Sequence, residues 1–274
     1  MKIPLAGVIG CPVGHSRSPL LHGTWLRAYG LRGHYVPLHV ERDDLARVLQ
    51  AMPAMGFVGA NVTIPHKEAA LALADQVSPI ARQIGAANTL SFRDGLIHAD
   101  NTDAYGFMEN LRLGANDWQP GAGPALVLGA GGAARAVLVA LAQAGVAEIW
   151  LSNRTRGRAE ALAGTLDHPV TVLDWDSYAG HLPRASLVVN TTSLGMDGQA
   201  PLGLPAAQLN PAAVVTDIVY TPLETPLLRD AAARGCRVVD GLGMLLHQAV
   251  PGFERWFGQR PEVTPELRRV VLGG

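Results

Sequence analysis

Lysine is almost absent from this chain: of its 22 basic side chains only Lys2 and Lys67 are lysines, and the others are arginines. Arginine therefore serves wherever a solvated positive charge is sufficient. An ammonium group exchanges its proton when its surroundings shift its pKa, whereas guanidinium keeps its charge. Lys67, which ends the segment Asn61-Val-Thr-Ile-Pro-His-Lys67, is thus a candidate acid/base. The alternative is a lysine at the start of a helix with no chemical role.

Cysteine is also scarce, with Cys11 and Cys236 far apart in the sequence. They share no metal-type spacing, and the nine histidines are scattered. We expect no metal site, and we expect two buried thiols in a cytoplasmic protein rather than a disulfide.

Long apolar runs and charge of one sign are missing as well. The net charge is −1 with no basic block, so neither nucleic acid nor an anionic membrane surface is an expected partner. Apolar stretches are interrupted well short of a bilayer's width, which predicts no membrane span.

The N-terminal segment, up to Gly10, is too short and too interrupted for a signal peptide, and residues 2–10 predict a strand. The oligomeric state stays open, with a homodimer among the alternatives.

What the chain does contain is enough apolar surface for two modest domains: 274 residues, 48% hydrophobic and 16% charged. In the first hundred residues, Ser18-Pro19 predicts a helix start with Ser18 as the cap. Asp94-Gly95 is a strong hairpin signal. The expected strands are 2–10, 34–40, 57–62, 88–92 and 96–99, and the expected helices are 20–29, 43–52 and 66–74.

After a helix over 104–113 and a Gly- and Pro-rich linker over 116–124, strands and helices alternate again. The first expected strand begins at Ala125, and further strands are expected over 148–152, 170–173, 186–190, 214–219 and 237–239. Helices are expected over 242–256 and 264–271. This alternation predicts an α/β fold with a doubly wound parallel sheet in the second half. We expect a domain over residues 1–103, completed by 245–274, and a second domain over 104–244.

A glycine-rich turn follows the strand that begins at Ala125. It reads Gly129-Ala130-Gly131-Gly132-Ala133 and leads into a helix. A tight turn without a ligand also uses glycine. In this context, however, Gly129 permits the turn, Gly131 lets a pyrophosphate approach the backbone, and the helix N-terminus attracts the anion. The pattern predicts a dinucleotide site.

The next strand ends in Asn153-Arg154-Thr155-Arg156-Gly-Arg158. An NAD site usually has an acidic residue here for the ribose 2′-hydroxyl. This chain has three arginines and a hydroxyl instead, which suit a 2′-phosphate. An exposed basic turn is the alternative, but cations at a helix start are disfavoured by the helix dipole. The expected cofactor is NADP(H).

Hydride transfer also requires a proton-transfer group and a carboxylate that orients it. Lys67 and Asp103 are the candidates, with Asp103 at the junction of the two halves. Asp103 also suits a helix cap, and both roles are compatible. Asp100 is close in sequence but is expected to face differently.

By its motifs the chain resembles the shikimate dehydrogenase family, over its full length and in the family's order. The motifs are Gly14-His15-Ser16-Arg17-Ser18-Pro19, Asn61 to Lys67, Ala87-Asn88-Thr89, Asp100 to Asp103, Gly129 to Ala133, Asn153-Arg154-Thr155, and Asp240-Gly241 through Gln248. The resemblance implies reduction of 3-dehydroshikimate to shikimate with NADPH, in aromatic amino-acid biosynthesis.

The resemblance also implies roles for single residues. Ser16 and Ser18 would hold the substrate carboxylate, and Lys67 would exchange the proton beside Asp103. Thr63, Asn88, Asp103, Tyr220 and Gln248 would bind the ring hydroxyls or line the pocket. Ile218, where many members carry Met, and Gly241 would lie near the nicotinamide. The cofactor set is Gly129, Ala130, Gly131, Gly132, Ala133, Asn153, Arg154, Thr155, Arg158, Ile218 and Gly241.

Purely structural roles remain for the minor positions. Ser18 could be a cap, Asn88 a strand end, Tyr220 packing and Gln248 a surface residue. Two other functions also remain: a quinate/shikimate dehydrogenase, and a non-catalytic ligand sensor on the same fold. Ser18, where quinate-using relatives tend to have Thr, and Arg154 argue against the first, and the intact Lys67 and Asp103 argue against the second.

Overall fold

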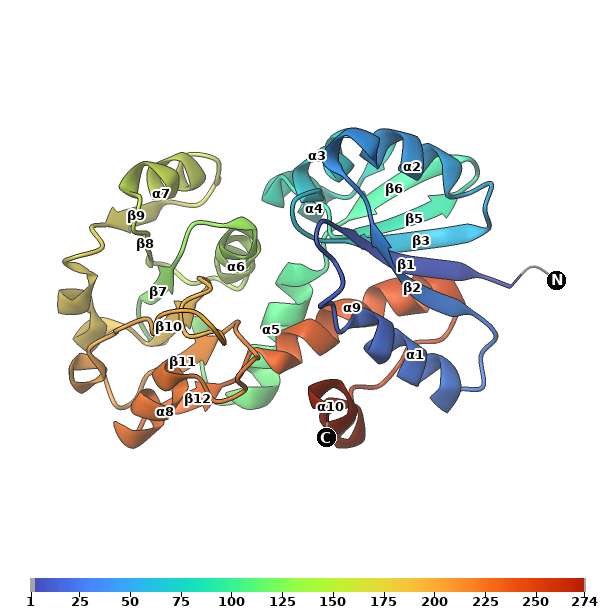
Figure 1. Cartoon of the computed structure of the whole chain (residues 1–274). Coiled ribbons are helices and arrows are strands. Elements are labelled where there is room, and N and C mark those ends of the chain that lie inside the picture. Colours follow the sequence, from blue (N-terminus) through green and yellow to red (C-terminus); the bar gives the residue numbers. More distant parts are fainter. Residues whose placement is uncertain (1–2, 274) are drawn as a thin grey trace. The chain divides into compact units, whose positions relative to one another are not determined.

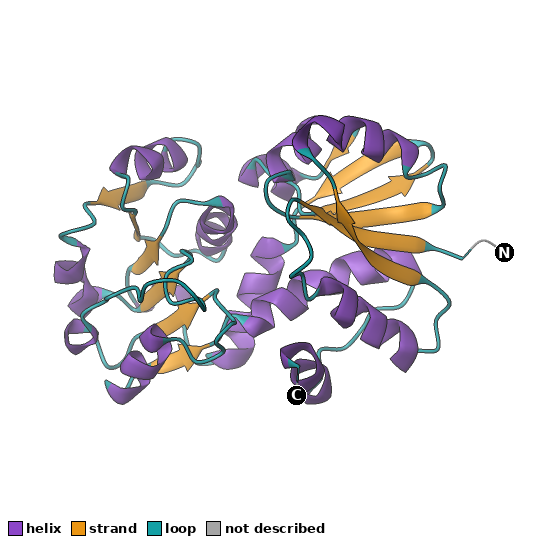
Figure 2. Ribbon diagram, in the orientation of Figure 1, coloured by secondary structure: helices purple, strands orange, loops and turns teal. Residues whose placement is uncertain are grey.

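The computed structural model describes residues 3–273 and divides into two units, one of residues 3–102 and 246–273 and one of residues 103–245. Each unit is built on a six-stranded sheet with helices packed on it (Figures 1 and 2). The expected α/β class is confirmed. Within the described part of the chain, no helix is both long and apolar enough to cross a membrane.

The first unit has a mixed sheet in the order β2-β1-β3-β5-β6-β4. Its strands are β1 (Leu5–Gly10), β2 (His34–His39), β3 (Phe57–Val62), β4 (Gln76–Val77), β5 (Thr89–Arg93) and β6 (Leu96–Asp100). β1 pairs in parallel with β2 and β3, and the β5–β6 hairpin adds antiparallel pairing. The expected hairpin turn is confirmed, since Asp94 and Gly95 both have positive φ, 53° and 75°.

Helices cover both faces of this sheet (Figure 1). They are α1 (Ser18–Ala28), α2 (Leu45–Ala51) after a short 3-10 turn (Arg42–Asp44), α3 (Lys67–Ala72), α4 (Pro79–Ile84), α9 (Leu242–Phe257) and α10 (Pro265–Leu272). Alternate residues of β1 face opposite ways, because side chains of a strand point to opposite faces in turn. Ile9 joins the core that includes Leu45 of α2, and Val8 joins the core that includes Trp256 of α9.

Two local expectations for this unit need correction. Ser18 is not the cap of α1: the helix starts at Ser18, Arg17 occupies the N-cap position, and Pro19 follows in the first turn. Cys11 is only half-buried, although Cys236 is buried and both are free thiols. No element was predicted between residues 74 and 88, yet the segment after α3 forms β4 and α4, with Ser78 capping α4. The predicted first strand begins at Leu5, and Lys2 lies outside the described residues.

The second unit has an all-parallel sheet in the order β12-β11-β10-β7-β8-β9. Its strands are β7 (Ala125–Leu128), β8 (Ile149–Ser152), β9 (Val170–Leu173), β10 (Leu187–Asn190), β11 (Val214–Asp217) and β12 (Arg237–Val239). The helices are α5 (Asp103–Gly114), α6 (Gly132–Gln143), α7 (Arg156–Ala163) and α8 (Pro226–Ala233), with 3-10 segments Pro120–Ala122, Tyr178–Arg184 and Ala206–Gln208.

This strand order is that of the doubly wound dinucleotide-binding fold, as the sequence predicts. The four central strands are buried on both faces and read as continuous apolar runs, which is typical of a parallel sheet covered by helices. The direction of winding reverses between β7 and β10. Ligands of such folds bind outside the carboxyl ends of the strands at this reversal.

Candidate functional site

Lys67 is the first residue of α3, directly after the loop that follows β3. Two hydrogen bonds fix the position of this helix start. The Lys67 carbonyl accepts from the amide of Ala87, with N···O of 2.9 Å, and the buried His66 ring donates through Nε2 to the Val40 carbonyl at 2.7 Å. The Lys67 side chain is half-buried. The predicted acid/base therefore projects from a rigid backbone next to the segment that carries Asn88.

Asn88 forms the centre of a buried polar cluster. Its amide nitrogen donates to Thr102 Oγ1 at 3.1 Å and to Gln248 Oε1 at 3.2 Å. Its amide oxygen accepts from the backbone amide of Thr102 at 2.7 Å. Gln248 is only 8% exposed, so the alternative of a surface residue is wrong. The structure thus brings together Asn88 and Gln248, two predicted site residues 160 positions apart.

Ser16 and Ser18 lie together at the entry to α1. The amide of Ser18 donates to Ser16 Oγ at 3.3 Å, so Ser16 binds an amide at the helix start. Ser18 is buried, and burial raises the pKa of Tyr35, which the nearby Ser18 hydroxyl partly lowers again. Tyr35 in turn donates to Asn61 Oδ1 at 2.7 Å.

Asn61 connects the two groups of polar residues. Its amide nitrogen donates to the Asn88 carbonyl at 3.1 Å and to Thr89 Oγ1 at 3.2 Å. A continuous chain of buried hydrogen bonds therefore leads from Tyr35 through Asn61 to Asn88. Buried polar groups of this kind are costly unless they are all satisfied, and satisfied networks hold their members in one geometry. Thr63, at the end of the same strand, is half-buried.

Asp100 and Asp103 fall in different units. Asp100 ends β6 and accepts from Ser78 Oγ at 2.5 Å, from the backbone amide of Asn101, and from Arg255 of α9. Burial alone would raise the pKa of Asp100, but the bonds from Ser78 and Arg255 outweigh it and lower the pKa. Asp103 begins α5 and is buried. Asp100 thus has a structural role within the first unit.

In the second unit, the glycine-rich turn lies at the reversal of the sheet. Gly129 has φ of +108°, and a Cβ there would lie 2.6 Å from Thr191 Oγ1, just beyond β10. This position therefore requires glycine for the fold. Gly131 and Gly132 do not have this requirement, because a Cβ at either would meet no atom within 4 Å.

The N-terminus of α6 has no side-chain cap, so its first amides are available to an anion. Side chains at Gly131 and Gly132 would fill the space in front of those amides. The pyrophosphate of a dinucleotide fits this space. Binding of the pyrophosphate would explain why glycine stands at positions 131 and 132, where the fold does not require it.

The three arginines after β8 differ in their partners. Arg156 is held by two carboxylates, Glu160 at 2.7 Å and Asp174 at 2.6 Å. Arg154 and Arg158 are exposed, and among residues 3–273 neither has an acidic partner. Asn153 donates from its side chain to the Thr155 carbonyl at 2.8 Å, which shapes the turn. Two arginines therefore remain available to a 2′-phosphate, and Arg156 serves the fold.

Ile218 and Gly241 lie in direct contact. A Cβ at Gly241 would lie 2.5 Å from the backbone carbonyl atoms of Ile218. Tyr220, two residues on, is half-buried. The backbone of Ile218 therefore leaves no room for a side chain at position 241, and the predicted role of the two residues beside the nicotinamide stays a prediction.

Sequence reasoning missed the carboxylate that holds this segment. Asp217, at the end of β11, accepts from the Val219 amide at 3.0 Å, from Asn190 Nδ2 at 2.9 Å and from Thr225 Oγ1 at 2.8 Å. Burial raises its pKa despite these bonds. The sequence did contain a signal for this carboxylate, because polar residues stand at the carboxyl ends of two buried strands, β10 and β11, where ligands of such folds bind.

Comparison with known proteins identifies the family. Residues 8–90 match the profile of the shikimate dehydrogenase substrate binding domain, residues 121–195 that of shikimate / quinate 5-dehydrogenase, and residues 241–271 that of the shikimate 5'-dehydrogenase C-terminal domain. The chain is 63% identical over 273 residues to shikimate dehydrogenase (NADP(+)) of Cereibacter sphaeroides (strain ATCC 17025), covering 99% of this chain and 98% of that protein. The enzyme of that name from Paracoccus denitrificans is also 63% identical, with 98% and 96% covered.

Solved structures agree in fold. A Thermus thermophilus shikimate 5-dehydrogenase in complex with NADP(H) and shikimate is 39% identical, with a TM-score of 0.86 over 98% of each chain. A Corynebacterium glutamicum quinate dehydrogenase in complex with NAD is 33% identical, with a TM-score of 0.92 over 98% of each chain. The fold is therefore shared by enzymes of different substrate and cofactor, while the higher sequence identities are to NADP-dependent enzymes. The chain belongs to the shikimate dehydrogenase family.

Proposed function

We propose that Lys67 and Asp103 carry out the proton transfer in an NADPH-dependent reduction of 3-dehydroshikimate to shikimate. The chain is an oxidoreductase of the shikimate pathway, its cofactor is NADP(H), and its substrate is a small molecule. The observation that carries the assignment of residues is the position of Lys67, one of only two lysines, at a rigid helix start beside Asn88.

When bound, NADP(H) supplies or accepts the hydride. Lys67 would give a proton to the oxygen of the reduced carbon, and would take it back in the reverse direction. A lysine does this because its ammonium loses a proton, which guanidinium does not. The Asp103 carboxylate would balance the ammonium charge and orient it.

The first unit would hold the substrate. Ser16 and Ser18 would donate to its carboxylate, and Thr63, Asn88 and Gln248 would hold the ring hydroxyls. Support comes from the hydrogen-bonded chain that runs from Tyr35 through Asn61 and Asn88 to Gln248, because it fixes the side chains of Asn88 and Gln248 before substrate arrives. Tyr220 of the second unit is assigned to the same substrate.

The second unit would hold the cofactor. The pyrophosphate would lie against the amides after Gly131, with the 2′-phosphate on Arg154 and Arg158, and with Asn153 and Thr155 shaping that turn. Ile218 and Gly241 would adjoin the nicotinamide. The open space at Gly131 and Gly132 supports this assignment.

The cytoplasm is the proposed compartment, since both cysteines are free thiols. A homodimer is an alternative to a monomer, and sedimentation velocity of the purified protein distinguishes the two.

The substrate assignment is tested by comparing shikimate with quinate, both with NADP⁺. Shikimate has a flat carbon next to its carboxylate, whereas quinate has a tetrahedral carbon with an added hydroxyl. An unmatched buried hydroxyl costs about 1–3 kcal/mol. We expect kcat/KM for shikimate to exceed that for quinate by at least about tenfold. Equal efficiencies would place the protein with the quinate-using enzymes.

The same assay tests the serines. Ser18→Ala should weaken shikimate turnover mainly through KM, because the carboxylate is bound away from the reacting carbon. A fall in kcat with KM unchanged would contradict this role. Ser177→Ala, an exposed serine of the second unit, is the control and should leave both constants unchanged.

A further inference from the structure

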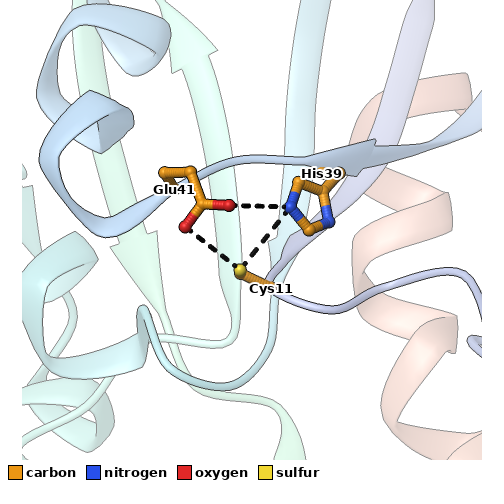
Figure 3. Close-up of side chains that lie close together, drawn as sticks. All are labelled: Cys11, His39 and Glu41. Atoms are coloured by element: carbon orange, nitrogen blue, oxygen red, sulfur yellow. Dashed lines mark hydrogen bonds and ion pairs between the residues drawn. The ribbon is translucent and has the colours of Figure 1, made fainter.

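Three side chains with metal-binding groups meet near the end of β1, apart from the residues assigned above. Cys11 Sγ lies 3.6 Å from His39 Nε2 and 3.4 Å from Glu41 Oε2, and His39 Nε2 lies 3.0 Å from Glu41 Oε1. Figure 3 shows the three groups pointing toward one another. Among the described residues, this is the one group of three such side chains whose ligand atoms all lie within 4.8 Å.

Strand register explains how distant residues come together. β1 and β2 pair in parallel with Gly10 opposite His39, and the Val40 amide donates to the Gly10 carbonyl at 3.2 Å. Cys11 directly follows Gly10 and therefore lies beside the end of β2. His39 and Glu41 are separated by one residue and reach the same point. Because Cys11 and His39 are 28 positions apart, their spacing in the sequence does not reveal the group.

The separations match those of zinc ligands. A tetrahedral zinc ion with Zn–S of about 2.3 Å and Zn–N and Zn–O of about 2.0–2.1 Å separates its ligand atoms by about 3.3–3.6 Å. The Cys11–His39 separation of 3.6 Å and the separation of 3.4 Å between Cys11 Sγ and Glu41 Oε2 fall in this range. The 3.0 Å from His39 is to the other carboxylate oxygen, Oε1, so the carboxylate must rotate to bring one oxygen to both neighbours. Glu41 is exposed and has room to do so.

We propose that Cys11, His39 and Glu41 form a binding site for one Zn²⁺ ion. Thiolate, imidazole and carboxylate are all ligands of zinc, and three protein ligands leave the fourth position to water. His39 and Glu41 are exposed and Cys11 is half-buried, so the ion reaches the site from solvent. On binding, the Cys11 thiol releases its proton to solvent and the sulfur coordinates as thiolate.

A reactive cysteine is the competing explanation of the same group. Reactive thiols lie in surroundings that lower the pKa, such as a neighbouring cation or a helix N-terminus. Here burial raises the pKa of the Cys11 thiol, and the carboxylate of Glu41 raises it further, against a smaller opposing effect of Arg42. These surroundings therefore differ from those of a reactive cysteine.

The site would also have a structural consequence. Cys11 opens the loop between β1 and α1 that leads to Ser16 and Ser18. A bound ion would tie the start of this loop to the end of β2. Because the ion binds only the folded arrangement, it should stabilise the protein.

The test is zinc titration of the full-length protein after chelator treatment and dialysis, followed by isothermal titration calorimetry. We expect one Zn²⁺ per chain and a rise in the melting temperature. Cys11→Ser, His39→Gln and Glu41→Gln should each weaken zinc binding by at least about tenfold, because each removes a ligand. Cys236→Ser, which alters the other free thiol, is the matched control and should bind as the wild type does.

Cobalt provides a second, independent measurement. Co²⁺ in this site should give the intense visible bands of tetrahedral geometry and a near-ultraviolet thiolate-to-metal band, and the latter should disappear in Cys11→Ser. Unchanged zinc affinity in Cys11→Ser, or a cobalt spectrum without the thiolate band, would overturn the proposal. None of these measurements uses shikimate or NADP, so their outcome tests the zinc site independently of the proposed function.

Discussion

Lys67 begins α3 in a chain that uses arginine for 20 of its 22 basic side chains, which makes exchange with arginine the informative substitution. We expect Lys67→Ala to lower kcat by roughly 10²–10⁴-fold, the usual contribution of a positioned acid/base. Lys67→Arg should be nearly as poor, because guanidinium keeps its proton. Steady-state rates with shikimate and NADP⁺ measure both, and turnover near that of the wild type in the arginine variant would leave Lys67 a charge role only.

Arg154 and Arg156 are a matched pair for the cofactor assignment, since Arg156 is bound to Glu160 and Asp174, whereas Arg154 has no such partner within residues 3–273. Losing a charge-assisted contact of about 1.5–3 kcal/mol corresponds to roughly ten- to a hundredfold in affinity. Arg154→Ala should raise KM for NADP⁺ by that factor and leave KM for NAD⁺ nearly unchanged.

The control, Arg156→Ala, should keep the ratio of the two KM values at that of the wild type. If Arg154→Ala weakened both cofactors equally, the side chain would support the fold without contacting the phosphate.

At the scale of residues, local motifs were enough to predict Gly129, whose positive φ and close packing against Thr191 the fold requires. They were not enough to predict Tyr35 or Asp217. The roles of these two depend on partners such as Asn61 and Thr225, and nothing in the local pattern says which distant side chain completes a buried network. The prediction that Ser18 caps α1 was wrong. A Ser-Pro pair also occurs with the serine as the first residue of the helix and the proline as the second, and this is the position of Ser18 and Pro19.

Among the elements, those with strong local signals were predicted within a few residues. The β5–β6 hairpin follows from Asp94-Gly95, and the second sheet follows from its buried apolar strands. α4 was missed although Ser78-Pro79 carries the same start signal as Ser18-Pro19. Its six residues are too few to show helical periodicity, and packing against the sheet decides that they form a helix.

The packing of α1 against β2 and α9 makes a prediction about pH. His22 of α1 is fully buried, and its ring stacks on Tyr35 with centroids 4.0 Å apart. Burial lowers its pKa to about 3. An unfolded histidine titrates near about 6.5, so the contribution of His22 to stability is present above that pH and is lost as the pH falls toward 3.

Between pH 7.5 and pH 5 this loss amounts to about 2 kcal/mol of unfolding free energy. His22→Phe should reduce the difference in stability between the two pH values by about that amount, as measured by urea unfolding. Any packing cost of phenylalanine applies at both pH values and cancels in the difference. An unchanged difference would contradict a neutral, buried His22.

On the scale of the whole molecule, alternating strands and helices were sufficient to predict two α/β units and a dinucleotide-binding fold in the second. The fold itself does not select the substrate or the cofactor, because a quinate dehydrogenase in complex with NAD has the same architecture with a TM-score of 0.92. We propose that the arginines after β8, together with Ser16 and Ser18 at the start of α1, make this distinction. The central claim therefore depends on a few side chains carried by a common scaffold.

The most direct test of that claim is oxidation of shikimate by the purified protein with NADP⁺ and with NAD⁺, followed by absorbance of the reduced nicotinamide. We expect rapid formation of NADPH, and kcat/KM for NADP⁺ at least about tenfold above that for NAD⁺, since we propose that Arg154 and Arg158 bind the 2′-phosphate, which NAD⁺ lacks. No oxidation of shikimate with either cofactor, or equal efficiency with both, would contradict the account.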